Sequence, residues 1–134
     1  MPIYRFAGAV FSTPFLKLAL IPEAASSLHA PMRMGYARAF SMLVMGRPLS
    51  AEEAQDAGIV NTVVACAEVD DVALKAAQEI AALPAGVVAV VRRLMRGRLD
   101  DVIERINTET MHCKELLKSG EARAAFAAFL ARKK

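Results

Sequence analysis

Residues 35–61, GYARAFSMLVMGRPLSAEEAQDAGIVN, carry the clearest local folding signals in the chain. Their first part, residues 35–46, is an apolar stretch with glycine at both ends, which predicts a short helix. Ser50 is followed three residues later by Glu53, the spacing of a capping box in which each side chain accepts a hydrogen bond from the other residue's amide. A second helix is therefore expected to begin at Ser50 and to end near Gly58, because glycine suits a helix C-terminus.

The segment before this pair of helices combines strand and helix signals. Residues 3–12, IYRFAGAVFS, predict one or two short strands, because aromatic and β-branched residues cluster there and Gly8 permits a turn. The apolar segment FLKLALI between Pro14 and Pro22 has the length of a strand. Small residues after Pro22 predict a short helix that ends or kinks near Pro31.

The chain after residue 58 is expected to turn from strand to helix. The β-branched segment IVNTVVA predicts one more strand, and the spacing of apolar residues predicts helices at 70–83, 85–98, 99–119 and after Gly120. We thus expect β-structure over about the first 60 residues and helix afterwards. So few strands cannot form a sheet that covers itself. Either they pair with another chain, or the sequence begins partway through a larger fold.

Composition and charge favour one small folded domain. The 134 residues are 55% hydrophobic and 23% charged, and the formal net charge is +3. Basic residues gather at 92–98 and at 132–134, where they form either solvated helix faces or a site for a phosphate-bearing ligand. Because no aromatic residues interleave with these charges, nucleic acid is not an expected partner.

Cysteine usage and hydropathy indicate the compartment. Cys66 and Cys113 are far apart and form no paired motif, which fits a reducing cytosol. No apolar run approaches the roughly 20 residues that a membrane-spanning helix needs. The N-terminal residues lack a signal peptide's order of positive charge before an apolar stretch. We expect a cytoplasmic protein without a membrane span.

One carboxylate, Glu23, stands alone in the otherwise apolar and small segment TPFLKLALIPEAASS at residues 13–27. It has two interpretations on the residues alone. In the first, Glu23 stabilises the positive end of the helix that follows and meets its free amides. In the second, its apolar neighbours raise its pKa, so that it can carry a proton at neutral pH. His29 and His112 have no acid in helical register, and we expect both to be structural or surface residues.

The order of these pieces resembles the enoyl-CoA hydratase/isomerase family, also called the crotonase superfamily. The resemblance rests on Gly35-Tyr36-Ala37-Arg38-Ala39, on Gly46, on LSAEEA at 49–54 and AGIVN at 57–61, and on the ending SGEARAAFAAFLARKK. It implies an α/β fold, a spiral of β-β-α units, of which this chain has the last strands followed by a mainly α-helical C-terminal region. Residues 1–64 would be the last part of the crotonase core, and residues 65–134 a helical region that forms trimers.

The same resemblance implies roles for particular residues. Hydratases of the family keep an acid after a proline where this chain has Thr13-Pro14-Phe15, so Phe15 stands in its place. The Δ3,Δ2-enoyl-CoA isomerase branch has a glutamate after the later proline, in a Pro-Glu-Gly pattern. Pro22-Glu23-Ala24 fits that branch, except that Ala24 replaces the glycine. Glu23 is therefore expected to be catalytic, and the expected substrate-binding residues are Phe15, Leu16, Phe126, Phe129 and Lys133.

The resemblance also implies the ligand and the assembly. The substrate would be an enoyl-CoA that carries its own coenzyme A, so no resident cofactor and no metal are expected. Arg132, Lys133 and Lys134 would meet the coenzyme A phosphates or form a solvated tail. A homo-oligomer, a trimer or hexamer at full length, is the expected assembly.

The sequence matches only some of the segments that carry the family's catalytic groups. The donors of the family's oxyanion hole belong to segments that nothing in this sequence matches, so we expect this chain by itself to be an inactive fragment. Two alternatives remain: a non-catalytic helical assembly module, and an enoyl-CoA hydratase in which Glu23 is incidental.

Overall fold

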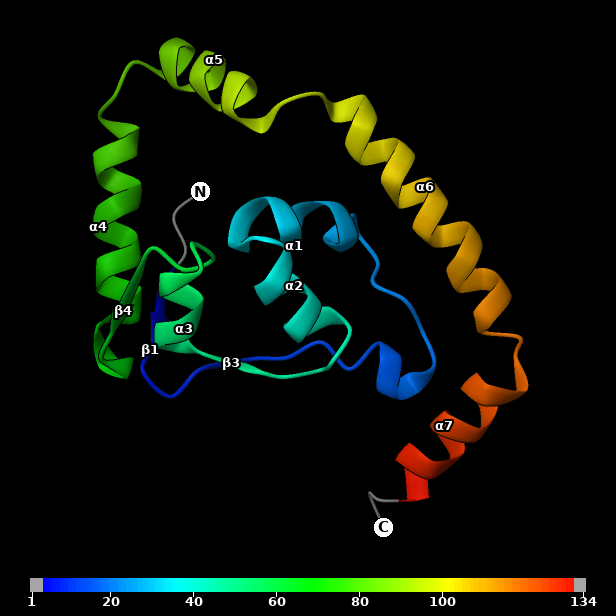
Figure 1. Ribbon diagram of the computed structural model, residues 1–134. Coiled ribbons are helices and arrows are strands. Elements are labelled where there is room, and N and C mark those ends of the chain that lie inside the picture. The colour runs from blue at the N-terminus through cyan, green and yellow to red at the C-terminus, as the bar shows by residue number, and fades with distance from the viewer. Residues whose placement is uncertain (1–3, 132–134) are drawn as a thin grey trace. The chain divides into compact units, whose positions relative to one another are not determined.

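The computed structural model describes residues 4–131 and is mainly helical (Figure 1). In chain order its elements are β1 Tyr4–Phe6, β2 Val10–Phe11, the 3-10 helix η1 Leu16–Leu18, α1 Ser26–Met34, α2 Tyr36–Leu43, β3 Leu49–Ser50, α3 Ala51–Asp56, β4 Thr62–Val64, the 3-10 helix η2 Cys66–Glu68, α4 Val69–Ala81, α5 Ala85–Arg96, α6 Leu99–Leu116 and α7 Gly120–Ala131. Short strands followed by long helices confirm the expected α/β region with a helical C-terminal part.

The described strands pair only in twos. β1 runs parallel to β4, with Tyr4 opposite Thr62, and β2 runs antiparallel to β3, with Val10 opposite Ser50. A two-stranded sheet of two or three residues is marginal in water by itself. The helices that contact these strands, α3 and α4, therefore supply much of the packing that holds them.

Two expectations for the first 60 residues are wrong. The segment between Pro14 and Pro22 is not a strand, because η1 and a left-handed residue, Ala19 (φ 54°), turn the chain there. The Phe15 carbonyl accepts hydrogen bonds from the amides of Leu18 (3.0 Å) and Leu20 (2.9 Å), so the local turn satisfies backbone groups that a strand would leave for a partner. In addition, α1, α2 and α3 make this part more helical than β.

The helices α1 and α2 form a pair around Gly35. Pro31 lies inside α1, which continues to Met34 before the chain turns at Gly35 (φ 77°). A positive φ of this size is a conformation that glycine adopts without a steric penalty. Met34, together with Ala39 and Leu43 of α2, is buried in this pair.

The capping box at the start of α3 is confirmed. The Ser50 hydroxyl accepts a hydrogen bond from the Glu53 amide (3.2 Å), and the Glu53 carboxylate accepts one from the Ser50 amide (2.7 Å). The helix buries the small residues Ala51 and Ala54 completely. Val60, whose amide donates a hydrogen bond to the Ala54 carbonyl, is also buried.

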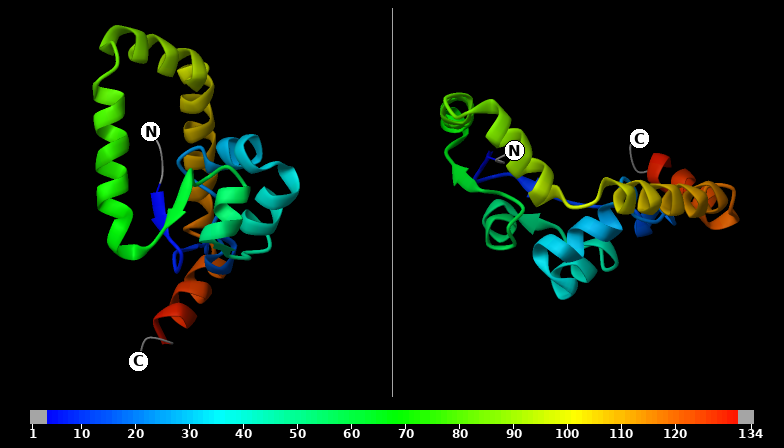
Figure 2. Two further views of the ribbon diagram at one scale, coloured as in Figure 1. Left: turned by 90° about the vertical axis from the view of Figure 1, so that its left-hand side faces the viewer. Right: turned by 90° about the horizontal axis from the view of Figure 1, so that it is seen from above.

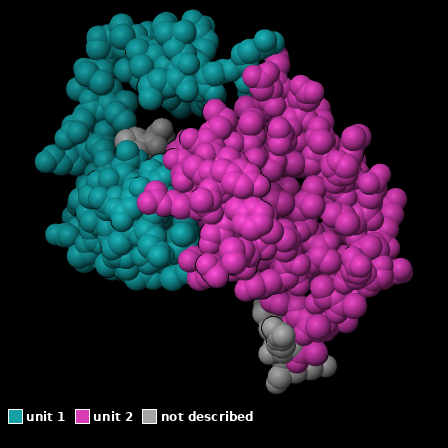
Figure 3. Space-filling model, in the orientation of Figure 1, with its two compact units in different colours: residues 1–11, 49–99 teal, residues 12–48, 100–134 magenta. Residues whose placement is uncertain are grey.

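The contacts divide the chain into two compact units (Figure 3). Unit 1 consists of residues 1–11 and 49–99, and unit 2 consists of residues 12–48 and 100–134. Each unit thus takes its residues from two separate stretches of the chain. The division at residue 64 that the family resemblance implies concerns the role of each part, and it stays a prediction.

Unit 1 has an apolar groove where α4 meets α5. The two helices are bent by 109° at their junction, which Figure 2 shows as a sharp corner. The groove has a volume of about 570 Å³, and its lining is apolar apart from Arg92: Ala77, Ile80, Leu83, Pro84, Val87, Val88, Val91 and Arg92. Within residues 4–131 no single helix is long and apolar enough to cross a membrane. The bent pair α4–α5 reaches the necessary length and apolar composition only when its two helices are taken together.

Candidate functional site

Glu23 lies in a left-handed turn directly before α1. The two residues after it, Ala24 (φ 56°) and Ala25 (φ 59°), both have positive φ. This conformation costs a non-glycine residue on the order of 1–2 kcal/mol. The Glu23 carbonyl accepts hydrogen bonds from the Ser26 amide (3.0 Å) and the Ser26 hydroxyl (2.6 Å), which hold the turn closed. The backbone of Glu23 is thus fixed to the first residue of α1.

A second glutamate, Glu109 in the middle of α6, caps this helix. Its side chain is only 4% exposed and is the one buried charged group among the described residues. Its carboxylate accepts hydrogen bonds from the amides of Ala25 (2.7 Å) and Ser27 (3.1 Å) and from the Ser27 hydroxyl. A buried carboxylate is tolerated when such donors replace water, and the positive end of a helix stabilises it further.

The capping interpretation of Glu23 is therefore wrong in its simple form. The amides at the start of α1 are met by Glu109, and α1 has no acidic residue in its first turn. The Glu23 side chain is exposed, and no hydrogen bond or ion pair joins its carboxylate to another residue within 4–131. Its carboxylate remains available to a ligand, as the proton-carrying interpretation requires.

The expected substrate-binding residues Phe15 and Leu16 lie at the start of η1. The Thr13 hydroxyl donates a hydrogen bond to the Met42 carbonyl (2.8 Å), which ties this segment to α2. Phe15 is half-buried and Leu16 is exposed. Both residues belong to unit 2, as does Glu23.

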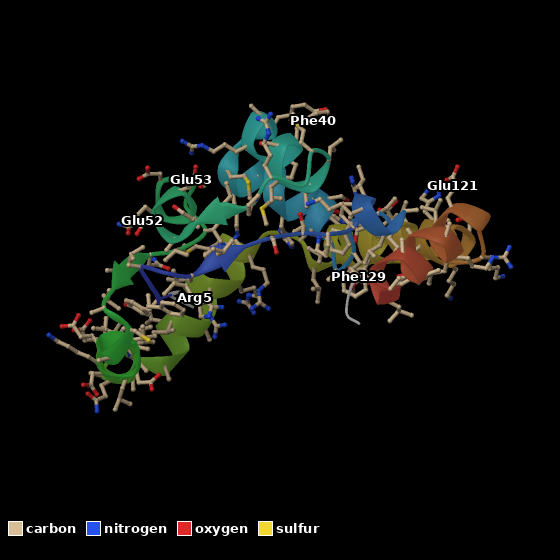
Figure 4. The ribbon with its side chains drawn as sticks, turned by 90° about the horizontal axis from the view of Figure 1, so that it is seen from below. Arg5, Phe40, Glu52, Glu53, Glu121 and Phe129 are labelled. Carbon is tan, nitrogen blue, oxygen red and sulfur yellow. The ribbon has the colours of Figure 1, made fainter. Side chains whose placement is uncertain are left out.

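The helix α7 contacts η1 and brings the second group of expected substrate-binding residues to this segment. Phe126 is half-buried, and Phe129, labelled in Figure 4, is exposed. The structure thus joins, at the level of elements, two apolar segments more than 100 residues apart in sequence. Lys133 lies outside the described residues, together with Arg132 and Lys134.

Other chemistry-bearing groups do not gather into a site. Across residues 4–131, no group of three or more His, Cys, Asp or Glu side chains could hold a metal ion. The expectation that His112 has no acid in helical register is wrong, because its Nδ1 atom lies 3.8 Å from a carboxylate oxygen of Glu115, three residues later on α6. His112 is nevertheless exposed, and His29 is half-buried in α1. Cys66 and Cys113 are free thiols.

Glu109 is the functional candidate that the sequence interpretation missed. A signal for it exists, because Val102, Ile106, Glu109, Cys113 and Leu116 follow one another at spacings of three and four residues. An acid on such an apolar stripe is an exception to helical amphipathicity. Only a partner far away in sequence explains it, and the stripe by itself does not identify that partner.

Comparison with known proteins places the chain in a family. A model of the enoyl-CoA hydratase/isomerase family matches residues 3–134, and the chain belongs to that family. The crystal structure of an enoyl-CoA hydratase/isomerase from Pseudoalteromonas atlantica T6c has a TM-score of 0.95 and 34% identity, covering 98% of this chain and 54% of that one. The family and the crotonase-like fold class expected from the sequence are confirmed.

Two curated relatives show the range of activities in the family. The chain is 32% identical over 107 residues to Enoyl-CoA delta isomerase 2 of Rattus norvegicus. The alignment covers 80% of this chain and 27% of that protein. The chain is also 33% identical over 97 residues to Carnitinyl-CoA dehydratase of Proteus mirabilis (strain HI4320). This alignment covers 72% of this chain and 37% of that protein. This chain thus spans well under half the length of either protein and about half of the solved structure.

The left-handed turn generates a stability prediction. Replacing Ala24 by glycine should raise the free energy of unfolding by about 0.5–1 kcal/mol, because relief of the positive-φ penalty exceeds the added entropy of the unfolded chain. Urea unfolding of the 134-residue chain measures the change. The matched control is Ala128→Gly in the interior of α7, which should lower stability by about 1 kcal/mol. A loss at Ala24 as large as that at Ala128 would contradict the strained turn.

Proposed function

We propose that the protein is an enoyl-CoA isomerase of the Δ3,Δ2 type in which Glu23 carries the proton. The observation that supports this proposal most is that Glu109 and Glu23 differ in their hydrogen bonds. Glu109 satisfies the amides at the start of α1, while the exposed Glu23 carboxylate has no partner within 4–131. The relative from Rattus norvegicus, named an enoyl-CoA delta isomerase, supports the reaction type.

The proposed reaction needs one base that gives back the proton it takes. The Glu23 carboxylate removes a proton from C2 of a 3-enoyl thioester, and the electron pair spreads over C1 to C4 and the thioester oxygen. Return of the same proton to C4 leaves the double bond between C2 and C3, so no atom is gained or lost. Glu23 is exposed in the chain by itself. A single carboxylate can perform both transfers once the bound substrate excludes water from it.

The negative charge on the thioester oxygen requires hydrogen-bond donors. Removing one such donor from an oxyanion hole typically costs about 3–4 kcal/mol of transition-state stabilisation, so a base by itself is insufficient. We place these donors in the part of the family fold that this sequence does not match. On this proposal the 134-residue chain by itself gives no measurable isomerase turnover.

The residue at the hydratase acid position favours proton return over water addition. Phe15 stands where hydratases of the family keep an acid, so no second carboxylate is expected to position water. We propose that the apolar residues Phe15, Leu16, Phe126 and Phe129 bind the acyl chain. Lys133 and the adjacent basic residues would meet the phosphates of the coenzyme A, which belongs to the substrate, so the protein needs no cofactor of its own.

A hydratase or dehydratase is the second candidate function. The relative from Proteus mirabilis is named a Carnitinyl-CoA dehydratase and matches 72% of this chain. Addition or removal of water at an enoyl thioester would need an acid that positions the water, and the absence of one at Phe15 places this candidate second.

Substitution of Glu23 separates a proton carrier from an incidental surface acid. In the protein at its full native length, Glu23→Gln should lower isomerase turnover by about 100- to 10,000-fold, because the amide cannot accept the C2 proton. The melting temperature should change little, since the carboxylate makes no described contact. Conversion of a 3-enoyl-CoA to its conjugated product is the assay. The control, Glu121→Gln in the first turn of α7, should leave turnover unchanged. A Glu23→Gln enzyme that keeps more than about a third of wild-type turnover would contradict the proton-carrying role of Glu23.

Phe15→Glu tests the choice between isomerase and hydratase. It restores an acid at the position where hydratases keep one, and it should allow detectable addition of water to a 2-enoyl-CoA. Phe15→Leu is the apolar control and should show none. If the unsubstituted protein already hydrates a 2-enoyl-CoA faster than it isomerises a 3-enoyl-CoA, the second candidate function replaces the first.

We also propose that the chain self-associates through its helical region, as a trimer or hexamer at full length. Several large apolar side chains of α5 are exposed, among them Val87 (61%), Leu94 (74%) and Met95 (82%). Monomers rarely expose contiguous apolar surface beyond a few hundred Å². Sedimentation at micromolar concentration should therefore give a species larger than the 14.4-kDa monomer. Leu94→Glu should weaken the association and Gln78→Glu should not; a clean monomer for the unsubstituted chain would contradict the proposal.

A further inference from the structure

We infer that Glu109 is a positioning residue for the proton-carrying carboxylate of Glu23, an inference that rests on the proposed function. Glu109 acts through the backbone of the turn and not by touching the substrate. Its two carboxylate oxygens bind the amides of Ala25 and Ser27, which follow Glu23 by two and four residues. A side chain in the middle of α6 thus sets where the turn before α1 lies.

Hydrogen bonds and the short backbone segment from Glu23 to Ser27 connect Glu109 to Glu23. Glu109 holds the amides of Ala25 and Ser27, and Ser26 between them donates both its amide and its hydroxyl to the Glu23 carbonyl. Each bond in this path lies within unit 2. Movement of the Ala25 amide would therefore also move the backbone from which the Glu23 side chain extends.

The strain in the turn makes this restraint necessary. Ala24 and Ala25 both have positive φ, a conformation that alanine leaves when no surrounding contact holds it. Without a carboxylate on the Ala25 amide, the turn can relax toward negative φ and carry Glu23 with it. A misplacement of the base by about 1 Å can reduce a rate by about 100-fold, even when the changed residue lies far from the reacting atoms.

Arg105 completes the arrangement around Ser27. It lies one helical turn before Glu109 on α6, and its Nη1 atom donates to the Ser27 hydroxyl at 3.3 Å. The Ser27 hydroxyl in turn donates to Glu109. Because the Ser27 hydroxyl has hydrogen bonds to both of these charged groups, a substitution of Ser27 is a second and milder way to loosen the turn.

The experiment compares kcat and KM for a 3-enoyl-CoA in the protein at its full native length. Glu109→Gln keeps the size of the side chain but replaces one acceptor oxygen with an amide group, which repels an N–H donor. We expect kcat to fall by about 10- to 100-fold while KM changes less than about threefold, because the base is misplaced and the substrate still binds. Ser27→Ala should lower kcat less, by about 3- to 10-fold. Glu104→Gln, an exposed carboxylate on the same helix, is the matched control and should leave both constants unchanged.

A double substitution distinguishes positioning from simple loss of stability. If Glu109 acts through Glu23, the Glu23→Gln/Glu109→Gln protein should be no slower than Glu23→Gln by more than about threefold, because there is no longer a base to misplace. A purely structural role would instead lower the melting temperature of Glu109→Gln and leave kcat of the folded enzyme near the wild-type value. That result, or a full additive loss in the double variant, would overturn the inference.

The outcomes also separate this inference from the proposed function. A Glu23→Gln enzyme that keeps its turnover overturns both. A slow Glu23→Gln enzyme with a Glu109→Gln enzyme within threefold of wild type overturns only the positioning role. If Glu109→Gln does not fold, Ser27→Ala decides: a fall in kcat of threefold or more at unchanged KM supports the inference, and an unchanged kcat overturns it.

Discussion

The interaction on which unit 2 most depends is the bond between the buried Glu109 carboxylate and the start of α1. It joins residues 84 positions apart, Ala25 and Glu109, at 2.7 Å. Transfer of a carboxylate out of water is costly unless hydrogen bonds replace its hydration. Two backbone amides, one hydroxyl and the positive end of α1 supply that replacement. Loss of the carboxylate would leave these buried donors unpaired, which costs about 1–3 kcal/mol for each group.

The same interaction is compatible with the proton transfer that we propose for Glu23, because it leaves that carboxylate without a structural partner among residues 4–131. A helix that begins in a strained left-handed turn needs an acceptor for its first amides, and a nearby acid would normally provide it. Here Glu109, which is distant in sequence, is the acceptor for these amides. The Glu23 carboxylate is therefore not needed to cap the helix. In the enoyl-CoA hydratase/isomerase family, to which the chain belongs, this arrangement suits a reaction that needs one mobile proton. Phe15 and the aromatic residues of α7 supply apolar surface in the same unit.

Local signals in the sequence predicted local structure. The spacing of Ser50 and Glu53 predicted the start of α3 correctly, because a capping box involves only neighbouring residues. The segment FLKLALI at 15–21 was misjudged because strand length and apolar character do not reveal the carbonyl of Phe15, which closes a turn instead. Glu109 was missed for a related reason: its partners at Ala25 and Ser27 are far away in sequence, and only the fold brings them together. For Glu23 the residues alone leave two interpretations open, and the proposed proton-carrying role is the one that the family resemblance favours.

The measurement that tests this account most directly is a crystal structure of the protein at its full native length with an unreactive acyl-CoA analogue bound. The account predicts a Glu23 carboxylate oxygen within about 3–3.5 Å of C2 of the acyl group, the distance of a near-attack geometry. It also predicts that both Glu109 oxygens keep their hydrogen bonds to the Ala25 and Ser27 amides. A structure in which another acid lies against C2, or in which Glu109 has left the turn while Glu23 remains in place, would contradict it.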